Sequence, residues 1–202
     1  MKRTVRVVTV FGSSRPRPGD AHYAQAQALG AALAAEGLVV CSGGYSGVME
    51  AVSRGAKEAG GHTLAVTAAA FRGKANAWVD EEIRVQSWRE RLFELVRLGR
   101  GYVACPGGTG TLVELAVVWE MLNKGLMKAR PLAVLGDFWQ PVIERVREVE
   151  LGHASRWGER EEALVRVAAS VEEAAAYLAK HVAKPAAGRR RQRGAESLLS
   201  PL

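Results

Sequence analysis

Short apolar runs alternate with longer amphipathic or alanine-rich stretches along most of the chain. The apolar runs predict strands at Val5–Phe11, Leu38–Cys41, His62–Thr67, Gly101–Cys105, Pro131–Leu135 and, more weakly, Leu164–Ala168. The longer stretches predict helices at Ala21–Glu36, Ser46–Ala59, Ser87–Leu98, Gly110–Asn123, Trp139–Val149 and Val171–His181. Continuous apolar strands that alternate with helices are typical of a parallel sheet covered on both faces. We therefore expect an α/β fold, a Rossmann-like, doubly wound, open parallel sheet.

Two segments fall outside this alternation. Ala68–Asp80 is a longer connection, which we expect to form a mobile flap over a site. Ala183–Leu202 is rich in Pro, Ala, Gly and Arg and has no periodicity, so we expect a disordered tail. The predicted organisation is one domain over residues 1–182 followed by a basic tail over residues 183–202.

The charge is concentrated in that tail. The chain has 202 residues and a net charge of +7, and the tail, with five basic residues and one acid, accounts for +4 of it. The body is only mildly basic, so we expect no nucleic-acid partner except through the arginine cluster Arg189–Arg193. The N-terminal apolar run is short and is interrupted by Arg6, which argues against a signal peptide or a membrane span. We expect a cytoplasmic protein.

Cysteine and histidine give no sign of a metal site. Cys41 and Cys105 lie at the ends of apolar runs and form no CxxC pair, so reduced core thiols are the simplest interpretation. The four histidines are scattered without metal-ligand spacing.

Glycine-rich turns follow three of the predicted strands. They are Gly12–Ser14, Ser42–Gly47 and Pro106–Thr111. Glycine lets the backbone turn sharply close to a ligand, and the N-terminus of a following helix attracts an anion. One such turn alone would be an ordinary strand-to-helix connection. Three at the same edge of a sheet predict a phosphate site.

The turns match none of the common nucleotide or hydrolase motifs. The chain contains neither GxxxxGK[ST] nor an intact GxGxxG. Residues 44–48 read GYSGV, so Val48 stands where the GxSxG motif requires its last glycine. P-loop chemistry, an ordinary NAD site and serine hydrolysis are therefore not supported.

Glu114 has two interpretations. Thr111 and Glu114 are spaced as a helix capping box. A carboxylate one turn behind a phosphate loop can also reach the sugar of a bound nucleotide and act as a base or stabilise a cationic sugar.

An arginine at the edge of the apolar stripe of the predicted helix Ser87–Leu98 needs an anionic partner. The arc that we expect to be buried contains Trp88, Leu92, Phe93, Leu95, Val96 and Leu98. Arg89 and Arg91 lie at opposite edges of this arc, and the spacing does not choose between them. An ion-paired or snorkelling arginine would have the same pattern.

Two segments resemble the Lonely Guy (LOG) family, whose members often carry the label "lysine decarboxylase-like". The first is Cys41–Met49, followed by Gly55-Ala56 and Gly60-Gly61, and the second is Pro106–Glu114, which reads PGGTGTLVE. Gly12–Ser14 with Tyr23 is similar to the family's first loop. The resemblance extends from Val5 to the last helix.

The resemblance implies phosphoribohydrolysis, in which a nucleoside 5′-monophosphate such as a cytokinin riboside monophosphate gives free base and ribose 5-phosphate. It implies Glu114 and Arg91 as catalytic residues, and the family spacing selects Arg91 over Arg89. The phosphate or substrate contacts that it implies are Ser13, Gly43, Gly44, Gly47, Met49, Gly107, Gly108, Thr109, Gly110 and Thr111. It further implies AMP or an N6-modified AMP as substrate, a homodimer and no cofactor.

The chain departs from the family pattern beside Arg91. The family's Arg-Lys pair reads Arg91-Leu92, and the preceding Met-His reads Trp88-Arg89. A second hypothesis is therefore a non-catalytic nucleotide-binding protein or a molybdenum-cofactor (pterin) carrier of the same fold. A third, lysine decarboxylation, is not supported because no lysine has the context of a pyridoxal-phosphate site.

Overall fold

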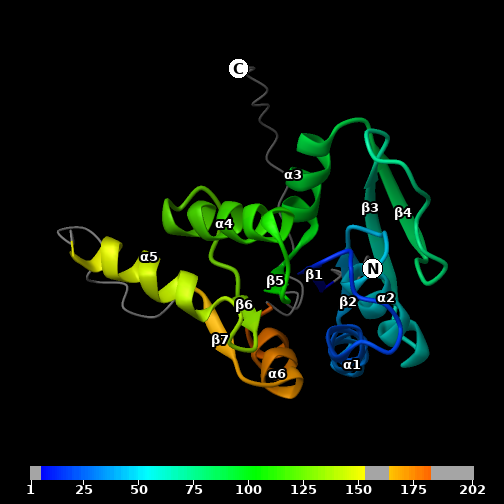
Figure 1. The fold of residues 1–202 in the computed structure, drawn as a ribbon, viewed down its shortest axis with the longest axis horizontal. Helices are drawn as coiled ribbons and strands as arrows, with labels where there is room; N and C mark the ends of the chain where they lie inside the picture. The colour runs from blue at the N-terminus through cyan, green and yellow to red at the C-terminus, as the bar shows by residue number, and fades with distance from the viewer. Residues whose placement is uncertain (1–5, 153–163, 183–202) are drawn as a thin grey trace, which may run out of the picture.

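The computed structural model describes residues 6–152 and 164–182 (Figure 1). Its strands are β1 (Val7–Phe11), β2 (Val39–Ser42), β3 (Thr63–Ala68), β4 (Glu81–Val85), β5 (Gly101–Ala104), β6 (Leu132–Leu135) and β7 (Arg166–Ala168). Its helices are α1 (Ala21–Ala35), α2 (Val48–Glu58), α3 (Trp88–Leu98), α4 (Thr109–Asn123), α5 (Gln140–Gly152) and α6 (Val171–His181).

The seven strands form one parallel sheet in the order β4-β3-β2-β1-β5-β6-β7. The chain runs outward from β1 to β4, crosses back to β5 beside β1, and then runs outward to β7. The order reverses between β1 and β5, where the loops after the two strands diverge and leave a crevice for a ligand. The predicted fold class is confirmed.

Helices cover both faces of the sheet. One apolar cluster joins α1, α2 and α6 to the sheet through residues such as Leu29, Val52 and Leu178. The other joins α3, α4 and α5 through residues such as Leu95, Trp119 and Ile143. In Figure 1 the two groups of helices lie on opposite sides of the strands. Burial on both faces explains why the central strands are continuously apolar.

The strand β4 was missed by the sequence pattern. Its sequence, EEIRV, carries three charges in five residues and no fully buried side chain, because β4 is the edge strand and pairs only with β3. Charged side chains are usual on such edges. The predicted flap, Ala68–Asp80, is therefore the connection between two parallel strands.

Two helices are less buried than their patterns predict. On α3, Trp88 and Phe93 are about half exposed, at 47% and 49%, although both were placed in the buried arc. On α4, which reads as apolar nearly all round, Leu112 and Val113 are partly exposed.

The remaining predictions concern boundaries and membranes. Most element boundaries differ from prediction by one to three residues. The predicted tail, residues 183–202, lies outside the described residues, as does Val5. Within the described residues, no helix is both long and apolar enough to cross a membrane.

Candidate active site

The three glycine loops meet at the carboxyl ends of β1, β2 and β5. The Ser13 amide donates to the Pro106 carbonyl at 3.3 Å, and the Ser13 carbonyl accepts from the Val48 amide at 2.8 Å. The Ser46 hydroxyl donates to the Ser14 carbonyl at 3.0 Å. These bonds join all three loops directly, so the predicted clustering at one sheet edge is present.

The second loop requires glycine where it contacts its neighbours. Gly44 and Gly47 have φ values of +78° and +71°, which side chains with a Cβ rarely adopt. A Cβ on Gly47 would also lie 2.4 Å from the Ser13 carbonyl oxygen. Gly47 therefore allows the first and second loops to touch.

The third loop ends in the N-terminus of α4. Gly108 is the N-cap residue and the helix begins at Thr109. The Thr111 side chain folds over Gly107, where an added Cβ would lie 2.2 Å from the Thr111 Oγ1. Because α4 begins two residues before Thr111, Thr111 is not an N-cap residue, and the capping-box interpretation of Thr111 and Glu114 is wrong. The backbone amides in the first turn of α4 have no carbonyl partner within the helix, and free amides in this position bind anions.

Glu114 lies one turn further along α4 and lines the cavity described below. Its side chain is 15% exposed, and no hydrogen bond is formed by its carboxylate within the described residues. Burial raises the pKa of Glu114 to about 7, although the nearby Arg91 guanidinium acts to lower it. Near neutral pH, this carboxylate therefore exchanges readily between its two protonation states.

Arg91 is the charged partner of Glu114. Its Nη1 lies 3.6 Å from the Glu114 Oε1, and its side chain is 8% exposed. Its Nε donates to the Val66 carbonyl at 2.9 Å, and its Nη2 lies 3.7 Å from the Met49 sulfur. A strand carbonyl and a thioether thus fix the guanidinium, and its charge faces the cavity.

Aromatic rings and a glycine complete the surroundings of Arg91. The guanidinium carbon lies 5.5 Å from the centre of the Tyr45 ring and 5.7 Å from that of Phe71. Contacts of this kind favour a cation. A Cβ on Gly43 would lie 1.6 Å from the Nη2 of Arg91, so Gly43 provides the space that the guanidinium occupies.

The structure distinguishes the two candidate arginines. Arg91 is buried and lines the cavity, whereas Arg89 is exposed and does not. Leu92, which occupies the position of the family's lysine, is 4% exposed and does not line the cavity. The departure at Leu92 therefore changes the packing of α3 rather than the wall of the site.

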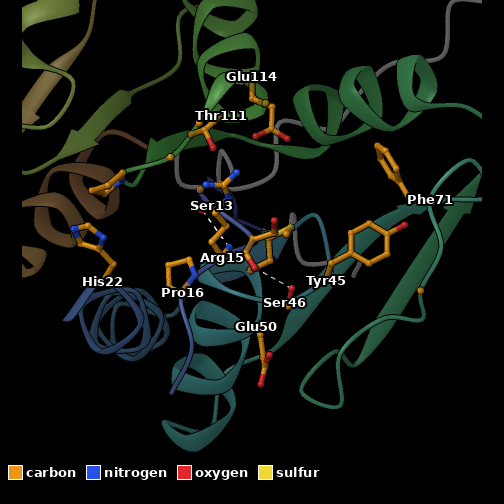
Figure 2. A pocket seen from close by; sticks show the side chains of 18 of the residues that line it. Ser13, Arg15, Pro16, His22, Tyr45, Ser46, Glu50, Phe71, Thr111 and Glu114 are labelled. Atoms are coloured by element: carbon orange, nitrogen blue, oxygen red, sulfur yellow. Dashed lines mark hydrogen bonds between the residues drawn. The ribbon is translucent and has the colours of Figure 1, made fainter. Parts of the chain in front are cut away.

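One large cavity, about 1320 Å³ in volume, contains these groups (Figure 2). Nine of the sequence-predicted site residues line it: Ser13, Met49, Arg91, Gly107, Gly108, Thr109, Gly110, Thr111 and Glu114. Gly43, Gly44 and Gly47 do not line it; they form the loop behind its wall. Figure 2 shows Ser13 and Thr111 near Glu114, with Tyr45 and Phe71 to the right and His22 to the left.

Sequence reasoning missed several lining residues. They are Arg15, His22, Tyr45, Glu50, Phe71, Arg72, Lys74, Asn76, Trp88 and Phe138, among others. Most come from loops with no periodic pattern. The length of the Ala68–Asp80 connection was the only available signal for those between 71 and 76.

The connection after β3 is fixed to the second glycine loop. The Asn76 side-chain amide donates to the carbonyls of Gly44 and Tyr45, both at 3.0 Å. The Tyr45 hydroxyl accepts from the Ala68 amide at 3.0 Å and lies 3.3 Å from the Ala68 carbonyl. The tip between these anchors carries Phe71, whose ring meets that of Tyr45 edge-on at 5.9 Å.

Residues 5–151 match the model of the SLOG cluster4 family. The chain belongs to this family. The match covers all three glycine loops, Arg91 and Glu114, and it confirms the resemblance that the two glycine motifs indicated.

Relatives of this SLOG protein include named phosphoribohydrolases. A probable cytokinin riboside 5′-monophosphate phosphoribohydrolase from Oryza sativa subsp. japonica is 33% identical over 135 residues, 64% of this chain and 58% of the relative. A cytokinin riboside 5′-monophosphate phosphoribohydrolase from Rhodococcoides fascians is 28% identical over 149 residues, 71% of this chain and 75% of the relative. The match spans little more than half the length of the rice relative.

Similar solved structures include cofactor-binding proteins. The molybdenum cofactor binding protein from Rippkaea orientalis is 26% identical, with a TM-score of 0.66 over 84% of this chain and 93% of that one. The molybdenum cofactor carrier protein from Chlamydomonas reinhardtii is 24% identical, with a TM-score of 0.64 over 87% of this chain and 97% of that one. The second likeness shows the fold alone.

Proposed function

We propose that this SLOG protein hydrolyses the N-glycosidic bond of a nucleoside 5′-monophosphate, a purine or cytokinin-type nucleotide, to free base and ribose 5-phosphate. The observation that carries the proposal is the Arg91–Glu114 pair, which lies in one cavity with the N-terminus of α4. The names of the relatives support the same reaction.

The geometry supports a role for each part of the site. The first-turn amides of α4 and the Thr109 and Thr111 hydroxyls hold the 5′-phosphate. This places the ribose near Glu114, one turn further along the helix. As the bond from C1′ to the base nitrogen breaks, positive charge develops on the sugar, and the ionised Glu114 carboxylate stabilises it.

Water completes the reaction. Its oxygen bonds to C1′, and one proton passes to the leaving base, so that ribose 5-phosphate and neutral base are formed. Glu114 orients this water or accepts its proton, for which a pKa of about 7 is well matched. Arg91 keeps the carboxylate directed into the cavity and favours its ionised form.

Incubation with AMP and with N6-modified AMP tests the proposal. Free base is measured chromatographically, with Glu114→Gln as the paired variant, because the amide keeps the shape and removes the charge. We expect base release that falls at least about a hundredfold in the variant. Equal release by both proteins, or none from any of several nucleotides, contradicts hydrolysis.

A second candidate function is a carrier of a phosphorylated pterin. The likeness to the Rippkaea orientalis protein favours it, since that protein is named for molybdenum-cofactor binding. Expression in a host that makes the cofactor, followed by fluorescence detection of oxidised pterin, tests it. Co-purified pterin without nucleotide turnover favours the carrier; turnover without pterin favours the hydrolase.

We further propose a homodimer. Trp88 and Phe93 on α3 and Leu112 and Val113 on α4 are large apolar side chains that remain partly exposed. Both helices cover the same face of the sheet, and large exposed apolar side chains on one face can form an interface between subunits. Light scattering of the protein, compared with a Phe93→Glu variant, tests this, and a monomeric wild-type chain would contradict it.

A further inference from the structure

The cavity is larger than the proposed substrate needs. Its volume is about 1320 Å³, whereas sites for small molecules commonly occupy about 300–1,000 Å³. The phosphate loop, Arg91 and Glu114 account for a 5′-phosphate and a ribose. The connection after β3 walls a further part of the cavity, which is left for the base and for any group that the nucleotide carries besides its 5′-phosphate.

That wall carries positive charge. Arg72 and Lys74 line the cavity from the tip of the connection, and residues 69–79 contain no acidic side chain. Neither cation forms an ion pair or side-chain hydrogen bond with any residue that the structure describes. By contrast, Lys57 at the base of the same region is paired with Asp80 at 2.6 Å.

The tip, residues 71–74, is exposed but is held in place by its neighbours. Gly73, between the two cations, has a φ of +140°, and a Cβ there would be in ordinary contact with the Tyr45 ring at 3.5 Å. Phe71 packs against the same ring, and Asn76 anchors the following backbone. Tyr45 thus supports the turn from which Arg72 and Lys74 project.

The place of this second cationic wall follows from its neighbour Phe71, whose ring centre lies 5.7 Å from the Arg91 guanidinium carbon. In Figure 2, Phe71 and Tyr45 lie to one side of Glu114, and Thr111 lies to the other. A nucleotide whose 5′-phosphate lies on the α4 loop and whose ribose lies at Glu114 has its 3′ side directed away from that loop. A group on the 3′ oxygen is therefore the part of the ligand that approaches the tip.

We propose that Arg72 and Lys74 form a second phosphate subsite, so that the preferred ligand is a nucleotide with a 5′-phosphate and a further phosphate on its 3′ side. This inference rests on the proposed function for the placement of the 5′-phosphate and ribose. It names a substrate class, the 3′-phosphorylated nucleoside 5′-monophosphates, which includes short 5′-phosphorylated oligonucleotides. Two cations with no other partner supply both the charge and the donors that a phosphate requires.

Calorimetric titration with defined probes tests the subsite. AMP, adenosine 3′,5′-bisphosphate and 5′-phosphorylated diadenylate are titrated into the Glu114→Gln protein, which holds turnover down. We expect at least one of the two larger probes to bind about tenfold more tightly than AMP, as two solvent-accessible charge contacts allow. Tighter binding of the bisphosphate indicates that the subsite takes a 3′ phosphomonoester, and tighter binding of the diadenylate indicates that it takes a 3′ phosphodiester.

Paired variants locate the effect. Adding Arg72→Ala and Lys74→Ala together should abolish the tenfold preference and leave AMP binding unchanged within about twofold. Adding Arg89→Ala and Lys128→Ala removes the same charge from exposed residues outside the cavity and should keep the preference. Equal affinity for all probes in the parent protein overturns the subsite, as does loss of the preference in both double variants.

The outcome for hydrolysis is read separately. Base release from AMP by the native chain reports the proposed function alone. A preference for the larger probes, without base release from AMP or from either larger probe, refutes hydrolysis and supports the subsite. Base release from AMP without the preference supports hydrolysis and overturns the subsite.

Discussion

The Arg91 guanidinium lies 3.6 Å from the Glu114 carboxylate, and no other described acidic side chain forms an ion pair with this arginine. The two groups come from α3 and α4, whose first turns flank the cavity on the same face of the sheet. Each is fixed by its own helix, and Arg91 is also fixed by β3 and Met49. The separation is long for a direct hydrogen bond, so both groups keep capacity for a ligand or a water.

The pH dependence of catalysis follows from the state of Glu114. If the ionised carboxylate stabilises the sugar cation, kcat/KM rises with pH, about tenfold per unit below pH 7, and levels off above it. Initial rates of base release from AMP at subsaturating concentration, between pH 5 and 9, check this. A rate that instead falls above pH 7 would show that the protonated acid is the active form.

Arg91 should set the position of that profile. Its positive charge lowers the pKa of Glu114 against the effect of burial, so Arg91→Ala should move the rising limb toward higher pH. The same variant should lose activity on the order of a hundredfold, and Arg91→Lys should restore the pH midpoint more than the rate. Arg89→Ala is the matched control, and a shift in that variant would contradict the assignment.

The sequence could predict the sheet and the three loops because both follow from strong local patterns. Continuous apolar strands and glycine turns depend little on the rest of the chain. The position of Arg91 depended on the family spacing, since Arg89 and Arg91 occupy equivalent edges of the helix pattern. Burial of Arg91 is a tertiary effect: the glycine at position 43 opposite α3 leaves room for its guanidinium.

The residues that the sequence did not reveal lie in segments whose hydrophobic pattern does not indicate their structure. β4 is a charged edge strand, and Phe71, Arg72 and Lys74 belong to a turn with no repeat. Likewise, Thr111 and Glu114 fit a capping box in sequence, but α4 begins at Thr109, so that spacing has no capping role. Helix starts are decided by loop contacts that a single sequence does not display.

Ionisation of Glu114 should lower the free energy of unfolding. Its pKa in the folded protein, about 7, lies above the ordinary value of 4.5, so the folded state binds more protons between these pH values. Stability therefore falls as pH rises from about 4.5 to 7 and stays lower above that range. The shift corresponds to about 3 kcal/mol at most.

Glu114→Gln checks this cost by urea unfolding at two pH values. The variant should be more stable than wild type at pH 8, and the gain should shrink or vanish at pH 4.5, where wild-type Glu114 is protonated when folded. Glu120→Gln, on the exposed face of the same helix, serves as the control. A variant less stable than wild type at pH 8 would mean that the carboxylate is stabilising.

Gly43→Ala should displace Arg91. The new methyl group would lie 1.6 Å from its Nη2 and 2.6 Å from the Met49 sulfur, so both side chains must move. Overpacking of this kind costs about 1–3 kcal/mol, and we expect base release to fall strongly as well. Gly110→Ala is the control for stability, since a Cβ there meets nothing within 4 Å. Unchanged activity in Gly43→Ala would separate Arg91 from catalysis.

Asn76 should hold the connection after β3 in place. Its amide donates to two carbonyls of the second glycine loop, and its Oδ1 accepts from the Trp78 amide. Asn76→Ala removes both side-chain bonds and leaves the Gly44 carbonyl only the backbone amide of residue 76, at 2.8 Å, so the tip should open more often. Trypsin cleaves after Arg72 and Lys74, and we expect cleavage there to quicken about tenfold in the variant, as mass spectrometry of timed digests can show. Gln86→Ala, an exposed position outside the connection, should cleave like wild type. Equal cleavage of Asn76→Ala and wild type would mean that the Asn76 side chain does not hold the tip.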